Sequence, residues 1–122
     1  MKRENYKEYI LKRSYKHSLD TIKFIDQLNN KDFSVQILSK QLLRSATSIG
    51  ANIMEAQAGT TTKDFANFIG YALKSANESI FWLNLLGDSK KAENIDYLLQ
   101  ETRELAKILG ASLATLRNQK RA

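Results

Sequence analysis

The chain of 122 residues contains no cysteine and no proline, and it has only five glycines. The absence of cysteine excludes disulfides and thiolate metal sites, and it fits a reducing compartment. The absence of proline, together with many Leu, Ala, Lys, Glu and Gln residues, favours long helices. The hydrophobic fraction of 43% is sufficient for the core of one domain.

Long apolar segments are also missing. The longest one, residues 80–87 (IFWLNLLG), is interrupted and too short to span a bilayer. The first residues, MKRENYKEY, are too polar for a secretory signal peptide. We therefore expect a cytoplasmic protein without a membrane partner.

Residues with catalytic or metal-binding potential are scarce. The single histidine, His17, lies on an apolar stripe, where a packed side chain is the simpler interpretation. The Glu-x-x-His pairs of di-iron bundles and a phosphate-binding glycine-rich loop are absent, and no motif of a serine nucleophile is recognised. We therefore expect no enzymatic activity, no metal and no cofactor.

Four segments show the apolar periodicity of helices, and short polar breaks separate them. Their expected bounds are residues 4–29, 33–58, 62–87 and 91–118. Short connections place consecutive helices antiparallel to one another. The sequence therefore predicts an all-α, up-down-up-down antiparallel four-helix bundle that forms a single domain over residues 1–122.

Residues that favour helix ends lie at the breaks between these segments. Asp32 or Ser34, then Thr61, and then Ser89 are the expected N-caps of the last three helices. Gly59 suits a left-handed cap at the end of the second helix. These positions predict tight turns rather than long loops.

A line of polar residues follows one face of the second segment. Arg44, Ser48, Asn52 and Glu55 are spaced by four, four and three residues, and no other charge lies between the first and the last. If the chain turns near residues 59–60, Arg44 lies level with Ser75 and within one turn of Glu78. We predict a partly buried polar ladder that sets the register of the two middle helices, with Arg44 paired to Glu78. A ligand-binding or catalytic site is the alternative.

The back of the two middle segments carries few charges. The residues expected to point away from the core are Leu43, Thr47, Gly50, Ala51, Met54, Phe81 and Leu85. A surface helix of a monomer normally places charged residues there. We therefore expect a homo-oligomer interface on this face, with small residues permitting close approach. Scattered apolar side chains on a monomer surface are the alternative.

The net charge of +6 favours an anionic partner, and nucleic acid is the commonest one. The bundle topology places the start of the first helix and the end of the last at the same end, where basic residues gather. The expected nucleic-acid-binding residues are Lys2, Arg3, Lys7, Lys12, Arg13, Lys16, Arg117, Lys120 and Arg121. Only Glu4 and Glu8 are expected to oppose them on the first helix, and Tyr6, Tyr9 and Tyr15 are positioned to stack on unpaired bases. A merely solvated basic surface is the alternative.

Three segments resemble those of a known family. RSATSIGANIMEA (residues 44–56) resembles the signature R-x-A-x-S-I-x-x-N-I-x-E-G of the bacterial four-helix bundle proteins found in intervening sequences of large-subunit ribosomal RNA genes. KDFANFIGYALKSANESIFWL (residues 63–83) resembles the segment that follows, with matches at Phe65, Phe68, Ala72, Ser75 and Glu78. LAKILGASLATL (residues 105–116) resembles the closing helix of that family. Ala56 and Lys74 stand where the family usually has glycine.

This resemblance implies a left-handed bundle that assembles as a ring, with five subunits. It also implies kinship with the accessory variability determinant of diversity-generating retroelements, a basic ring that binds nucleic acid and a reverse transcriptase. We therefore expect a non-catalytic oligomer that binds RNA or DNA without sequence specificity, with a reverse transcriptase or another protein as a further partner. A protein-interaction scaffold without a nucleic-acid role is the alternative.

Overall fold

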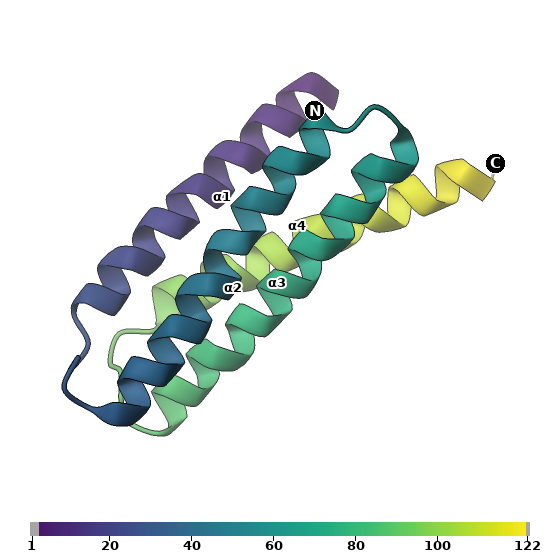
Figure 1. Cartoon of the computed structure of the whole chain (residues 1–122). Helices are drawn as coiled ribbons and strands as arrows, with labels where there is room; N and C mark the ends of the chain where they lie inside the picture. The colour runs from purple at the N-terminus through teal and green to yellow at the C-terminus, as the bar shows by residue number, and fades with distance from the viewer. Residues whose placement is uncertain (1–2, 122) are drawn as a thin grey trace.

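The computed structural model describes residues 3–121, and the side chains of residues 5–118. It contains four helices, α1 (Arg3–Asp26), α2 (Phe33–Ala58), α3 (Thr62–Asp88) and α4 (Asp96–Arg121). They run alternately up and down, and both termini lie at the end where α2 connects to α3 (Figure 1). The predicted all-α antiparallel four-helix bundle is confirmed.

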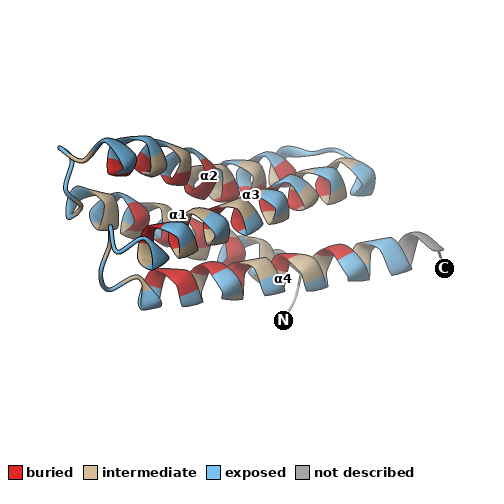
Figure 2. Ribbon diagram, turned by 90° about the horizontal axis from the view of Figure 1, so that it is seen from below, coloured by how far each residue is buried: buried red, intermediate tan, exposed pale blue. Residues whose placement is uncertain are grey.

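The apolar stripes of the helices meet in the middle of the bundle (Figure 2). Near the chain termini, Ile10, Ile53, Ile69 and Leu109 form one cluster of buried side chains. Leu42, Leu83, Leu86 and Leu98 belong to a second cluster toward the opposite end. In the described part of the chain, no helix combines the length and the apolar content needed to cross a membrane.

Buried hydroxyl groups and a histidine interrupt this apolar core. Ser45 on α2 and Ser79 on α3 are both fully buried, and their hydroxyl oxygens lie 2.8 Å apart. His17 on α1 is 1% exposed, and its Nε2 lies 2.7 Å from Thr102 Oγ1 on α4. A buried polar group needs such a partner, so each pair restricts how two helices can be positioned.

Three helices begin or end at residues other than those the sequence predicts, and the largest differences are at the end of α1 and at the start of α4. α1 stops at Asp26 instead of residue 29, because the amide groups of Gln27 and Leu28 bond three residues back and tighten the last turn. α4 begins at Asp96 instead of residue 91 and ends at Arg121 instead of residue 118. Lys90 and Asn94 have positive φ angles of 62° and 56°, and this conformation interrupts a right-handed helix.

The caps agree with the prediction at two of the four turn positions. Asp32 accepts a hydrogen bond from Val35 N at 3.1 Å, and Thr61 accepts one from Asp64 N at 3.0 Å. Ser89 caps the end of α3 rather than the start of α4. Gly59 is extended (φ −65°, ψ 142°), so the left-handed cap is wrong. A Cβ atom there would lie 3.1 Å from Ala56 O, so the tightness of the turn explains the glycine.

Gly50 lies where α1 and α2 approach each other closely. A Cβ atom on Gly50 would lie 3.3 Å from Ser14 Oγ and 3.6 Å from Ser14 O. Ser14 is buried, and its hydroxyl donates a hydrogen bond to Leu11 O. The prediction that Gly50 points away toward a second subunit is therefore wrong, because this glycine faces α1 of its own chain.

Alanine substitutions at two mid-helix glycines test this close approach. Gly110→Ala is expected to raise the free energy of unfolding by about 0.5–1 kcal/mol, through the higher helix propensity of alanine, because a Cβ atom there has no neighbour within 4 Å. Gly50→Ala has the same propensity gain but must displace Ser14, so we expect it to be no more stable than the wild type. Urea unfolding at one protein concentration compares the two. A Gly50→Ala variant as stable as Gly110→Ala contradicts the close approach.

Candidate nucleic-acid interface

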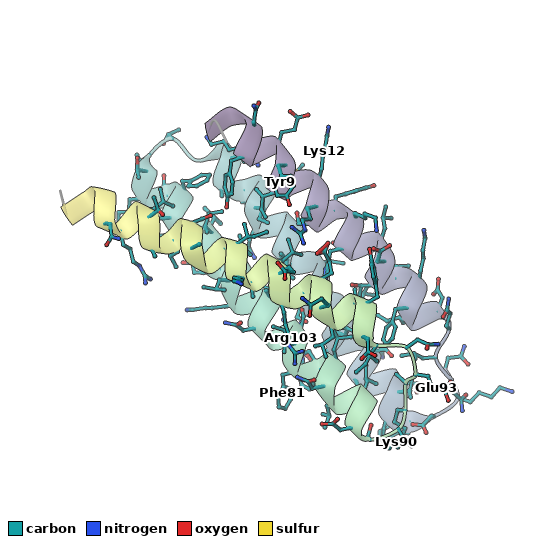
Figure 3. The ribbon with its side chains drawn as sticks, turned by 180° about the vertical axis from the view of Figure 1, so that it is seen from behind. Tyr9, Lys12, Phe81, Lys90, Glu93 and Arg103 are labelled. Atoms are coloured by element: carbon teal, nitrogen blue, oxygen red, sulfur yellow. The ribbon has the colours of Figure 1, made fainter. Side chains whose placement is uncertain are left out.

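Two of the α1 lysines predicted to bind nucleic acid, Lys12 and Lys16, lie in ion pairs along their own helix. Lys12 Nζ lies 2.8 Å from Glu8 Oε1, and Lys16 Nζ lies 2.7 Å from Asp20 Oδ2. These carboxylates raise the pKa of both lysines. Lys12 nevertheless points away from the bundle (Figure 3). The expectation that only Glu4 and Glu8 oppose the basic residues of α1 is wrong, because acidic residues farther along the chain also pair with them.

Arg13 forms the most enclosed of these pairs. Its Nε donates to both carboxylate oxygens of Glu101 on α4, at 3.0 and 3.1 Å, and its Nη1 donates to the Tyr9 hydroxyl at 2.7 Å. The bonds to Glu101 raise the pKa of Arg13. The side chains of Arg13 and Glu101 are only 24% and 18% exposed. Arg13 therefore joins α1 to α4, and a phosphate group has to break this bond to reach it.

The other residues of the predicted basic end have different environments. Lys7 Nζ lies 5.1 Å from the centre of the Phe65 ring on α3, in a cation–π arrangement. Tyr6 is half-buried and hydrogen-bonds Ser112 on α4, so its ring is not free to stack on a base. Tyr15 is 66% exposed. Lys2 and the side chains of Arg3, Lys120 and Arg121 lie outside the described residues.

A second basic surface lies between α3 and α4. A groove of about 610 Å³ runs there, and its lining includes Lys63, Lys74 and Arg117 but no carboxylate. All three cations are exposed, and none forms an ion pair within the described residues. Lys107 on α4 is also exposed and forms no ion pair within the described residues. No acidic residue follows Glu104 in the sequence. We call Lys63, Lys74, Lys107 and Arg117 the α3–α4 cations.

Of the α3–α4 cations, sequence reasoning identified only Arg117. The sequence could also have identified Lys74 as an unpaired cation. Its acidic neighbour at position i+4 is Glu78. Glu78 is also the predicted partner of Arg44, and one carboxylate paired across two helices leaves Lys74 without a counter-charge. For Lys63 and Lys107 the absence of an acidic residue four positions away was the available signal.

The predicted ion pair of the polar ladder is confirmed. Arg44 Nη2 donates to Glu78 Oε2, and Glu78 Oε2 also accepts a hydrogen bond from Trp82 Nε1 at 2.9 Å. The side chains of Arg44 and Glu78 are 58% and 37% exposed, so the pair is more open than predicted. Pairs this exposed contribute about 0–1 kcal/mol to stability, which leaves registration of α2 against α3 as their main effect.

The rest of the ladder does not connect the two helices. Ser48 Oγ donates to Arg44 O at 2.7 Å, and Asn52 Nδ2 donates to Ser48 O at 2.8 Å, so both side chains bond the backbone of α2. Glu55 is exposed and Ser75 half-buried, and neither side chain has a hydrogen bond among the described residues. The buried link between α2 and α3 is instead the Ser45–Ser79 pair.

The apolar back face of α2 and α3 is exposed, as predicted for most of its members. Leu43 is 39% exposed, Met54 60%, Phe81 58% and Leu85 39%. Ala51 is exposed and Thr47 half-buried. Figure 3 shows Phe81 projecting from α3. These six residues, without Gly50, form what we call the back face.

Metal-binding constellations are absent from the described residues, where no group of three or more His, Asp or Glu side chains could hold a metal ion.

Comparison with known proteins agrees with the motifs. The profile of the 23S rRNA-intervening sequence protein family matches residues 7–111. One similar solved structure is a protein of unknown function from the S23 ribosomal protein family of Bacteroides thetaiotaomicron, with 32% sequence identity and a TM-score of 0.81. The match covers 88% of this chain and 97% of that one. No curated protein matches significantly. Because the family profile extends over parts of all four helices, the chain belongs to the 23S rRNA-intervening sequence protein family.

Proposed function

We propose that this protein is a non-catalytic homo-oligomer that binds nucleic acid through its phosphate backbone, without sequence readout, as an accessory factor. The observation that carries the proposal is the set of α3–α4 cations, none of which pairs with a carboxylate within the described residues. An unpaired cation binds phosphate without first giving up a protein partner, and it releases counterions from the nucleic acid as it does so.

The back face supports the oligomeric part of the proposal. Exposed Met54, Phe81 and Leu85 present apolar surface that a second copy of the chain can cover. The ring of five subunits implied by the family resemblance repeats the cations of one chain around the assembly. Several weak phosphate contacts on one strand then act together, which raises affinity without any new kind of contact.

Fluorescence anisotropy with short labelled RNA and DNA, at several salt concentrations, tests binding on protein whose mass is known from light scattering. We expect affinity to fall steeply as salt rises, with a logarithmic slope of about −0.7 to −0.9 for each neutralised phosphate. Lys63→Gln with Lys107→Gln should weaken binding more than Lys12→Gln with Lys16→Gln, although both pairs remove the same charge. Absence of binding at low salt by the assembled oligomer contradicts the proposal.

The paired variants also locate the interface. A larger loss from the α1 pair than from the α3–α4 pair places the interface on α1, where the sequence predicts it. If the oligomer forms but binds neither RNA nor DNA, a protein-interaction scaffold becomes the better account. A reverse transcriptase is then the partner to test by co-purification, following the family resemblance.

A further inference from the structure

We propose that the groove between α3 and α4 holds an unpaired nucleobase of a single strand, while the cations on its rim hold the flanking phosphates. This inference rests on the proposed function and adds to it a site and a preference for single strands. It starts from the composition of the groove, which places cations and apolar side chains together in one hollow.

The floor of the groove is apolar. Ala66 and Gly70 on α3 face Leu113 and Leu116 on α4, and Gly70 leaves the floor open because it has no side chain. The remaining lining polar groups include the amide of Asn67, which has both a donor and an acceptor. An apolar floor with a few polar groups is suited to an aromatic ring that has hydrogen-bonding edges.

The wall of the groove adds an aromatic ring. Tyr71 lines the groove and is 48% exposed. Its ring packs edge-to-face with Phe68, at 5.7 Å between ring centres and 87° between planes. A ring supported in this way is a stacking platform that loses little freedom when a base binds, and such stacking tolerates any base.

The charge of the groove selects the occupant. The lining contains Lys63, Lys74 and Arg117 and no carboxylate, so a neutral or cationic ligand leaves these groups without a counter-charge. A volume of about 610 Å³ is within the range of small-ligand sites. A single strand supplies both flat rings and regularly spaced anions, whereas the bases of a duplex are stacked and cannot enter.

Comparing the affinity for a strand with bases and for a strand without them distinguishes insertion of a base from binding of phosphates. The probes are a labelled oligo(dT) and an equally long strand of abasic sites, which has the same phosphates. We expect the wild type to bind oligo(dT) roughly tenfold more tightly than the abasic strand, because a base that stacks on an aromatic ring adds to the affinity that the phosphates alone provide. Equal affinity for the two strands overturns this inference but leaves the proposed function intact. Failure to bind either strand contradicts the proposed function itself.

A substitution that fills the groove tests whether the base binds there. Gly70→Leu adds a side chain over the floor, where a Cβ atom meets only Leu113 Cδ2, at 3.8 Å. Gly110→Leu is the matched control, because residue 110 does not line the groove. Gly70→Leu should abolish the preference for oligo(dT) over the abasic strand, and Gly110→Leu should preserve it. A preserved preference in a folded Gly70→Leu variant overturns the inference.

A charge variant keeps the test valid even if Gly70→Leu does not fold. Lys74→Gln should weaken binding of oligo(dT) and lower its salt slope by about 0.7. Lys40→Gln on α2 removes the same charge from another exposed lysine, which forms no ion pair among the described residues, and should change binding less. Equal effects of the two substitutions count against a site in the groove.

Discussion

Replacing Phe81 and Leu85 by glutamate is expected to dissociate the proposed oligomer into monomers that keep their helical content. Burial of such side chains contributes about 1.5–3 kcal/mol each, and a charge buried in an apolar contact is unfavourable. The dissociation constant of each subunit contact should therefore rise on the order of a thousandfold or more. Both side chains are well exposed, at 58% and 39%, so the bundle itself has little reason to unfold. Light scattering and circular dichroism measure the mass and the helix content.

The matched control is a double substitution on α1. Leu19 and Ile22 are 41% and 42% exposed, and glutamate at both positions adds the same charge to another apolar site. We expect the mass of this variant to equal that of the wild type. Dissociation by the α1 substitutions, with none by those at Phe81 and Leu85, places the interface on α1. A monomeric wild type contradicts the oligomer altogether.

Acidification from pH 6.5 to pH 4 is expected to lower the stability of the fold through His17. Burial lowers the pKa of His17 from 6.5 to about 4, although Glu101 and Asp20 nearby act to raise it. In this pH range the unfolded chain binds a proton that the folded protein does not, so the free energy of unfolding falls as the pH falls. The loss levels off below pH 4 and amounts to about 2–3 kcal/mol.

Two measurements check this prediction. Because His17 is the only histidine, its imidazole NMR signals cannot be confused with those of another histidine. These signals should titrate with a midpoint near pH 4. His17→Gln keeps a group that can bond Thr102 but does not titrate. Its free energy of unfolding should therefore change much less between pH 6.5 and pH 4.5 than that of the wild type. A titration midpoint near 6.5 in the folded protein contradicts the buried environment.

The helices and their order follow from local patterns. Apolar residues recur at helical spacing in all four segments, and Asp32 and Thr61 cap the helices that follow them. Proximity along the chain also made the Arg44–Glu78 pair predictable, because a short turn fixes the relative height of α2 and α3. The start of α4 was not predictable in this way, since its spacer depends on the positive φ angles of Lys90 and Asn94.

Contacts between helices that are distant in sequence did not follow from such patterns. Arg13 and Glu101 are 88 positions apart, and their pairing removes a cation that looked available on the first helix. Gly50 shows the same difficulty, because only the rotation of α2 about its axis decides whether this glycine faces solvent or α1. A rotation of one residue is 100°, enough to exchange the two environments.

The amino-acid sequence was thus sufficient for the helical class, the topology and the family, because periodicity, capping and short turns act over a few residues. The packing of the four helices against one another decides three further features. These are the lack of ion pairs at the α3–α4 cations among the described residues, the buried environment of His17 and the groove between α3 and α4. Side-chain packing sets the height and rotation of each helix, and it thereby decides which charges neutralise each other and which remain for a ligand.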